Sequence, residues 1–236
     1  MELYEVDIHS EAMLSIDAII FDFDGVIIDT ETPDFLTWQN IFRSFSVDLE
    51  MELWLDHVGG RSSEFDVFKH LQDITGLKLD ELEIKQTRRK EYVALVESYP
   101  LMPGVLNYLD TCKDNSLWLG LASSSPRDWV EGHLSRMGIL EYFDCIRSSD
   151  DVVNAKPYPD LYWSCMDGLG TSPKSSIAIE DSLNGVTAAK GAQMWCVAVP
   201  NSITTHLSFE KADLVLESLD QISLFDLINT LPLNTD

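Results

Sequence analysis

Short apolar runs that end in small or acidic residues recur along this chain, and they constrain its fold more than any other feature. Continuous apolar character over about four to six residues is typical of strands in a parallel sheet buried on both faces. The runs are IDAIIF (16–21), LWLGLA (117–122), FDCI (143–146), SIAI (176–179), MWCVAV (194–199) and DLVL (213–216). Helical patterns lie between the later runs, so the sequence predicts a doubly wound α/β domain.

Three of these helical patterns have recognisable ends. Pro126 opens a pattern that closes at Gly138, and a second pattern closes with Gly168 and Gly170. Ser182 precedes a third pattern as a predicted N-cap, because its side chain can accept a hydrogen bond from the first turn. These ends separate the helices from the strands that follow them.

The segment from about residue 33 to residue 100 has a different pattern. Its apolar residues recur with helical periodicity, and no convincing strand lies among them. We therefore predict an α/β core of residues 1–32 and 101–236, with a helical cap of residues 33–100 inserted after the first strand. A length of 236 residues is sufficient for such a core and a small cap.

The charge of the chain limits its partners. Forty acidic and sixteen basic residues give a formal net charge of −24. Nucleic acids and anionic membranes require a basic surface, so neither is an expected partner. A phosphorylated substrate would also be repelled, and its site must therefore supply cations locally. No apolar run approaches the roughly 20 residues that span a bilayer, and we expect a cytoplasmic monomer.

The segment FDFDG, residues 21–25, carries two carboxylates at the end of the first predicted strand. Side chains at i and i+2 of a strand point the same way, so Asp22 and Asp24 are expected on one side. Gly25 allows a sharp turn after them. Two neighbouring carboxylates are costly unless a cation or a proton lies between them. A solvated strand end is the alternative explanation for this segment alone.

Polar residues also follow the other predicted strands. Ser123, Ser124 and Ser125 come after the second strand, Lys156 lies in NAKPYPD after the third, and Glu180 and Asp181 follow SIAI. Ligands of open parallel sheets bind at the carboxyl ends of the strands. One edge thus receives acids, hydroxyls and an ammonium group, which are the groups that phosphoryl transfer requires.

The segments DFDGVIIDTE, LASSS, AKPYPD and IEDSLNG resemble, in order and spacing, the four motifs of the haloacid dehalogenase superfamily. The chain is most similar to the branch that contains β-phosphoglucomutase and sugar-phosphate phosphatases. This resemblance extends from about residue 16 onward. It implies a Rossmann-like core with a doubly wound parallel sheet and an inserted α-helical cap domain.

The resemblance also implies a role for each motif residue. Asp22 would be the nucleophile that forms an aspartyl-phosphate, and Asp24 the general acid and base, with its backbone carbonyl on the metal. Lys156 would offset the negative charge of Asp22 and of the phosphate. Asp181 would ligate Mg²⁺, with Glu180 as a direct or water-mediated ligand, and Mg²⁺ suits such an all-oxygen set.

Substrate binding is predicted for a second group of residues. Ser123 resembles the hydroxyl that binds the transferring phosphoryl group, with help from the Ser124 backbone N–H. Gly25 is placed in the same phosphate-binding group. Arg61, in VGGRSSE (58–64), matches the cap loop from which an arginine reaches the substrate. A surface arginine after a Gly-Gly turn is the alternative.

Two departures from the family pattern favour a phosphatase that acts on a small phosphorylated metabolite. Where β-phosphoglucomutases carry a histidine at the cap hinge, this chain has Asp34, and Arg88 stands where they carry a cap lysine. Arginine does not replace lysine as a hydrogen-bonding group. A phosphosugar mutase remains the alternative activity. A non-catalytic binding protein is a further alternative, which predicts the loss of at least one motif residue.

Overall fold

Within the part of the chain that the structure describes, six parallel strands form one sheet in the order β3-β2-β1-β4-β5-β6. The computed structural model describes residues 16–58 and 65–231. The strands are β1 (Ala18–Phe21), β2 (Trp118–Ala122), β3 (Cys145–Arg147), β4 (Ser176–Glu180), β5 (Trp195–Ala198) and β6 (Leu214–Val215). Each predicted apolar run overlaps one of them, so the predicted fold class is confirmed. β1 lies in the middle, between β2 and β4.

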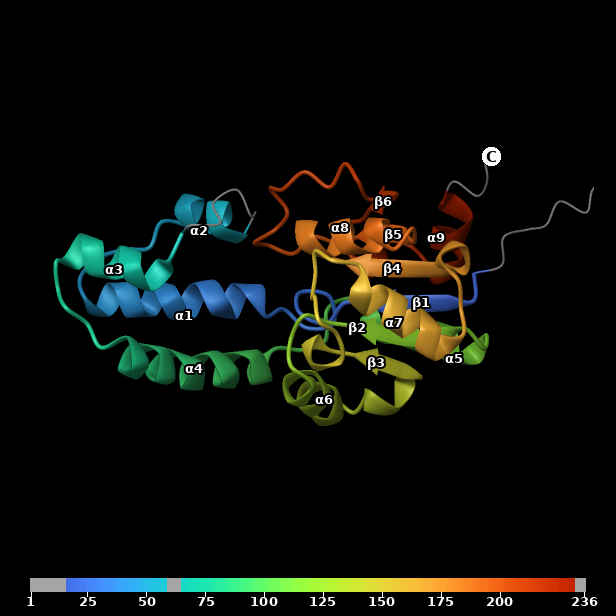
Figure 1. Cartoon of the computed structure of the whole chain (residues 1–236), viewed down its shortest axis with the longest axis horizontal. Coiled ribbons are helices and arrows are strands. Elements are labelled where there is room, and N and C mark those ends of the chain that lie inside the picture. Colours follow the sequence, from blue (N-terminus) through green and yellow to red (C-terminus); the bar gives the residue numbers. More distant parts are fainter. Residues whose placement is uncertain (1–15, 59–64, 232–236) are drawn as a thin grey trace, which may run out of the picture.

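The helices divide into two groups (Figure 1). Around the sheet lie α5 (Val105–Asp114), α6 (Arg127–Arg136), α7 (Asp160–Leu169), α8 (Leu183–Gly191) and α9 (Leu224–Thr230). Beyond one end of the sheet lie α1 (Glu31–Ser44), α2 (Met51–Val58), α3 (Val67–Thr75) and α4 (Glu81–Ser98), which we call the helical unit. The helical unit follows β1 directly in the chain and precedes α5.

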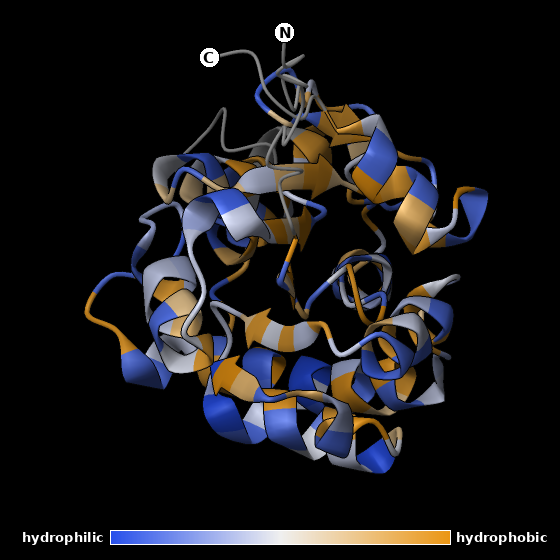
Figure 2. Ribbon diagram, turned by 90° about the vertical axis from the view of Figure 1, so that its right-hand side faces the viewer, coloured by the Kyte–Doolittle hydropathy of each residue, from blue (hydrophilic) through white to orange (hydrophobic). Residues whose placement is uncertain are grey.

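The strands bury side chains on both faces of the sheet, and those on one face are mostly small. In β1, Ile19 and Phe21 belong to a core cluster with residues of α5, α6 and α9. Ala18 and Ile20 belong to a second cluster with residues of α7 and α8. In Figure 2 the strands are mostly hydrophobic, while the helices mix hydrophobic and hydrophilic residues. Burial on both faces explains why the strands appear as continuous apolar runs in the sequence.

Three predicted helix ends are confirmed. The Ser182 hydroxyl accepts a hydrogen bond from the Gly185 backbone N–H at 3.0 Å, which caps α8. Gly138 follows the end of α6 with a φ of 71°, and Gly170 is the C-cap of α7 with a φ of 69°. Left-handed backbone at this position is the usual way for a helix to end.

The helical unit is built around a separate hydrophobic cluster, which Ile203 of the segment after β5 joins. Phe35, Trp38 and Phe42 of α1 pack in one cluster with Trp54 of α2 and Leu71 of α3. The two connections between this unit and the sheet are paired, because Ile28 and Leu101 form an antiparallel bridge. None of the helices within residues 16–58 and 65–231 is long and apolar enough to cross a membrane.

Candidate active site

The carboxyl ends of the central strands bring the predicted motif residues together. Asp22 directly follows β1, and its backbone N–H donates to the Ile179 carbonyl of β4 at 2.9 Å. Glu180 ends β4, Asp181 follows it, and Ser123 follows β2. These four residues are all buried, with exposed fractions of 7% or less. β2, β1 and β4 lie side by side (Figure 1), so their carboxyl ends deliver acids and a hydroxyl to one edge of the sheet.

Lys156 lies between two buried carboxylates. Its Nζ atom is 2.5 Å from Asp22 Oδ1 and 2.6 Å from Glu180 Oε1, and its side chain is 5% exposed. The Tyr162 hydroxyl of α7 donates to the same Glu180 oxygen at 2.6 Å. Burial opposes the positive charge of Lys156, but attraction to Asp22 and Glu180 outweighs it and raises the pKa of the ammonium group. Lys156 is therefore held beside Asp22 in its charged form.

Three carboxylates form a group that could hold a metal ion. Asp22, Glu180 and Asp181 each offer an oxygen, and these oxygens lie within 4.8 Å of one another. Burial raises the pKa of Asp22 to about 7 although Lys156 opposes the shift, and burial also raises the pKa of Asp181. The ionised forms are therefore short of compensating positive charge. A hard divalent cation such as Mg²⁺ prefers oxygen ligands of this kind, and the donor set fits it.

Gly25 and Asn201 enclose Asp181. Gly25 has a φ of 82°, and a Cβ atom on it would lie 2.0 Å from Asp181 Oδ2. Only glycine combines this backbone conformation with so close an approach to the carboxylate. Asn201 Nδ2 donates to the same oxygen at 2.7 Å. Asn201 was not singled out in the sequence, although its position shortly after β5 is a signal that the strand-end argument could have used.

Asp24 is half-buried and faces the start of α6. Its Oδ2 atom accepts a hydrogen bond from the Ser125 hydroxyl at 2.6 Å, and its Oδ1 atom accepts one from the Trp129 indole N–H at 3.1 Å. Ser123 Oγ is 3.4 Å from Oδ2 and accepts the Ser125 backbone N–H at 3.0 Å. The Ser124 side chain is exposed. Of the three serines, Ser125 thus makes the closest contact with Asp24, and neither this contact nor Trp129 was predicted.

A further acid, Glu31, lies near these groups at the start of α1. Burial, together with the nearby carboxylates of Asp34, Asp24, Asp29 and Asp22, raises the pKa of Glu31 to about 8. This shift identifies a concentration of negative charge around the site that extends onto the helical unit. The only signal in the sequence was its place as the last residue of the first motif segment, DFDGVIIDTE.

The two departures from the mutase pattern contact each other. The Arg88 guanidinium forms an ion pair with the Asp34 carboxylate and lies 3.1 Å from the Thr37 hydroxyl. It also lies over the rings of Trp38 and Tyr92, at 4.8 and 5.5 Å from their centroids. Both side chains are thus engaged within the helical unit. Arg61, the predicted substrate-binding arginine, lies outside the described residues.

A cleft of about 570 Å³ opens between α4 of the helical unit and α6 of the core. Asp24 and Ser125 line it together with Arg89, Tyr92, Trp129 and His133. One wall is therefore the predicted general acid with its two hydrogen-bond donors, and the rest of the lining combines aromatic side chains with charged ones of both signs, including Glu97 and Asp128. The cleft is large enough for a small organic molecule.

The fold is thus a doubly wound sheet with a buried aspartate, a lysine and further carboxylates at its carboxyl edge, where α/β proteins of this kind bind their ligands. The family model "Haloacid dehalogenase-like hydrolase" matches residues 19–199. The chain belongs to this family, which confirms the resemblance found in the sequence.

Two bacterial relatives are similar over nearly the whole chain. YhcW of Bacillus subtilis is 43% identical over 216 residues, which cover 92% of this chain and 98% of that protein. Hexitol phosphatase B of Escherichia coli is 31% identical, with coverage of 89% of this chain and 96% of that protein. The second of these is named for the hydrolysis of a phosphate ester.

Solved structures show the same fold. CbbY from Rhodobacter sphaeroides, solved in complex with phosphate, is 30% identical with a TM-score of 0.68, covering 90% of this chain and 99% of that chain. A β-phosphoglucomutase from Clostridium difficile is 26% identical with a TM-score of 0.68, covering 91% of this chain and 96% of that chain. A phosphatase name and a mutase name thus both occur among the similar proteins.

Proposed function

We propose that this protein is a Mg²⁺-dependent phosphatase that hydrolyses a small phosphorylated metabolite through an aspartyl-phosphate on Asp22. The observation that carries the proposal is the contact of Lys156 Nζ with Asp22 Oδ1 at 2.5 Å, beside the acid group that Asp22 forms with Glu180 and Asp181. A buried carboxylate paired with a fixed ammonium group can attack phosphorus where a solvated one would be less reactive.

The residues of this chain divide the chemistry between them. An Asp22 oxygen attacks phosphorus, and the bond from phosphorus to the leaving oxygen breaks as Asp24 donates its proton to that oxygen. Water then attacks the phosphoryl group, Asp24 takes up a proton, and Asp22 is released as a carboxylate. Lys156 stabilises the negative charge that Asp22 shares with the phosphoryl group, and Ser123 and the Ser124 backbone N–H are proposed to bind its oxygens.

Asp22, Asp181, the Asp24 backbone carbonyl and Glu180 would hold Mg²⁺. Bound there, Mg²⁺ supplies positive charge for the phosphate oxygens and for the excess of carboxylates. Asn201 keeps Asp181 in place through its hydrogen bond of 2.7 Å. Glu180 has a second duty, because its Oε1 atom accepts from both Lys156 and Tyr162 and so fixes the lysine.

We further propose that residues 33–100 act as a cap over a core of residues 1–32 and 101–236. The paired connections at Ile28 and Leu101 provide a narrow junction about which such a cap can move. Closure would exclude water while the phosphoryl group is transferred. Arg61 and Gly25 remain candidates for contact with the substrate.

Hydrolysis is favoured over a mutase reaction by the pairing of Asp34 with Arg88. A mutase must keep the phosphoenzyme from water until the sugar is in place. In this chain, the two positions that depart from the mutase pattern neutralise each other within the helical unit. The guanidinium is further held between Trp38 and Tyr92, so it is not free to act as a lysine would.

A sugar or polyol phosphate is the substrate class that we propose. Hexitol phosphatase B is named for such substrates, and CbbY has been solved in complex with xylulose-1,5-bisphosphate. The formal net charge of −24 disfavours large anionic substrates, whereas a small phosphate ester needs only the local charge of Lys156 and Mg²⁺.

The test is phosphate release from sugar phosphates, hexitol phosphates, nucleotides and an aryl phosphate, with Mg²⁺ and with EDTA. We expect metal-dependent release by the wild-type protein and none by Asp22→Asn. Release by Asp22→Asn at more than a few per cent of the wild-type rate would contradict the aspartyl-phosphate mechanism. If no substrate released phosphate and a hexose 1-phosphate was isomerised, the mutase activity would be established instead.

A further inference from the structure

Trp129 makes a hydrogen bond that restricts the chemistry of Asp24. Its indole N–H donates to Asp24 Oδ1 at 3.1 Å, while Ser125 Oγ lies 2.6 Å from Oδ2. An indole N–H can only donate, whereas a serine hydroxyl can either donate or accept. Oδ1 must therefore remain an acceptor in both protonation states of Asp24. When the carboxyl group is protonated, the proton resides on Oδ2.

The indole ring is held from both sides of the cleft. Tyr92 of α4 stacks on it, with ring centroids 5.6 Å apart and planes 14° apart. The Arg89 guanidinium, also from α4, lies 4.4 Å from the Trp129 centroid. His133, one turn further along α6, packs its ring edge-on at 4.1 Å. Trp129 thus lies on α6 of the α/β core, but two residues of α4 contact its ring, so its orientation depends on the position of the helical unit.

We propose that Trp129 is a positioning residue that selects Oδ2 as the proton-carrying oxygen of Asp24 and links this selection to the position of α4. This inference rests on the phosphatase function proposed above. It goes beyond it, because no motif of the family pattern includes Trp129 and its effect is exerted through Asp24. Ser125 completes the arrangement, since its hydroxyl donates to Oδ2 when Asp24 is ionised and can accept a hydrogen bond from Oδ2 when Asp24 is protonated.

The proposal predicts a dependence on the leaving group. In the first step, the bond between phosphorus and the leaving oxygen breaks, its electron pair stays on that oxygen, and the Oδ2 proton moves to it. An alkoxide needs this proton, whereas a p-nitrophenolate leaves as a stable anion without it. Loss of the Trp129 hydrogen bond therefore affects an alkyl phosphate and spares an aryl phosphate. A general loosening of the site would affect both alike.

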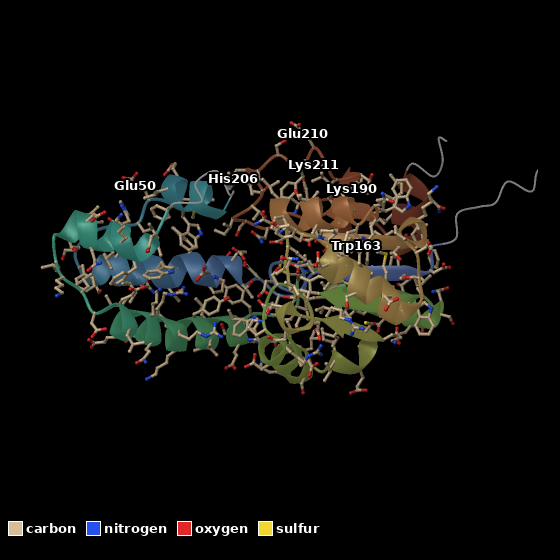
Figure 3. All side chains as sticks on the ribbon, in the orientation of Figure 1. Glu50, Trp163, Lys190, His206, Glu210 and Lys211 are labelled. Carbon is tan, nitrogen blue, oxygen red and sulfur yellow. The ribbon has the colours of Figure 1, made fainter. Side chains whose placement is uncertain are left out.

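The experiment compares kcat/KM for a hexitol phosphate and for p-nitrophenyl phosphate in Trp129→Phe, in the full-length protein with Mg²⁺. Phenylalanine keeps an aromatic ring against Tyr92 but lacks the N–H. The matched control is Trp163→Phe, since Trp163 is 52% exposed on α7 (Figure 3), and α7 packs on the opposite face of the sheet from α6. General acid catalysis contributes about 10²- to 10⁴-fold, and misplacing the acid should forfeit part of it.

We expect kcat/KM for the hexitol phosphate to fall about 10-fold or more in Trp129→Phe and that for p-nitrophenyl phosphate to stay within about 2-fold. Trp163→Phe should change neither. Equal losses on both substrates, or no loss on either, would overturn the inference while leaving the phosphatase function intact. No activity in the wild-type protein would instead refute the proposed function itself.

A second measurement covers the case in which Trp129→Phe does not fold. Indole N–H resonances of the ¹⁵N-labelled protein are compared between wild type and Asp24→Ala. We expect one resonance to move upfield, since its hydrogen-bond acceptor is gone. An unchanged set of indole resonances would show that the hydrogen bond on which the inference depends does not form.

Discussion

Replacement of Lys156 by methionine offers the sharpest test of how the site is held together. The ammonium group is the positive charge nearest to Asp22 Oδ1 and Glu180 Oε1 among the described contacts, at 2.5 and 2.6 Å. Removing one partner of a buried ion pair leaves an uncompensated charge and costs about 3–5 kcal/mol. Methionine fills a similar volume, so the loss reports the charge rather than a cavity.

Lys190→Met is the matched control. Its Nζ atom is also 2.6 Å from a carboxylate oxygen, Oδ2 of Asp213, but the two side chains are 31% and 16% exposed. Figure 3 shows Lys190 on α8 at the outside of the sheet. Water can replace the lost partner there, so we expect a loss of about 1 kcal/mol or less. The two variants thus share residue type and distance and differ in burial.

The assay is urea denaturation in EDTA at pH 6 and pH 8. Lys156 lowers the pKa of Asp22, which burial has raised to about 7, so its removal raises that pKa further. An acid with a higher pKa in the folded state than in the unfolded state destabilises the protein as the pH rises from its unfolded-state pKa to its folded-state pKa. The free energy of unfolding lost in Lys156→Met should therefore be larger at pH 8 than at pH 6. Equal losses for Lys156→Met and Lys190→Met at both pH values would refute this reasoning.

Three further outcomes follow from the geometry of the site. Gly25→Ala should abolish Mg²⁺-dependent activity, since its Cβ would lie 2.0 Å from Asp181 Oδ2. Gly138→Ala, which has a φ of 71° but open space around it, should remain active and lose about 1–2 kcal/mol of the free energy of unfolding. Activity assays and urea denaturation curves compare the two variants. The melting temperature of the wild-type protein in EDTA should fall from pH 5 to pH 8, because Asp22 and Asp181 have raised pKa values. The fall should be less steep in Asp22→Asn. A melting temperature that does not change with pH would contradict the raised pKa values. Mg²⁺ with a phosphate mimic should raise the melting temperature of wild type more than that of Gly25→Ala, as differential scanning fluorimetry can measure.

The sheet and the gathering of acids at its carboxyl edge could be predicted from the sequence because their causes are local. Strands buried on both faces must be apolar throughout, and a strand end is marked where the apolar run meets Asp22 or Glu180. Parallel topology then places those ends together without any knowledge of side-chain geometry. The Ser182 cap and the glycine helix ends follow from backbone chemistry in the same way.

Contacts between the helical unit and the core could not be predicted in this way. Trp129 lies four residues beyond Ser125, and nothing in the sequence indicates that it would bond to Asp24 and stack on Tyr92 of α4. Such contacts depend on the crossing of two helices that are distant in the sequence. The same is true of the Asp34–Arg88 pair, whose members are 54 residues apart. Asn201 is an intermediate case, since its strand-end position was visible but its partner was not.

Charge balance explains why this site calls for a divalent cation. Among the residues that the structure describes, Asp22, Glu180 and Asp181 bring three carboxylates into a buried space with one ammonium group, that of Lys156. Protons can compensate the remainder, as the raised pKa values of Asp22 and Asp181 indicate, but a protonated Asp22 cannot attack phosphorus. A phosphate ester adds further negative charge at the same place. Mg²⁺ would resolve both conflicts together, because it would keep the proposed nucleophile ionised and compensate the substrate, so substrate binding and metal binding should each strengthen the other.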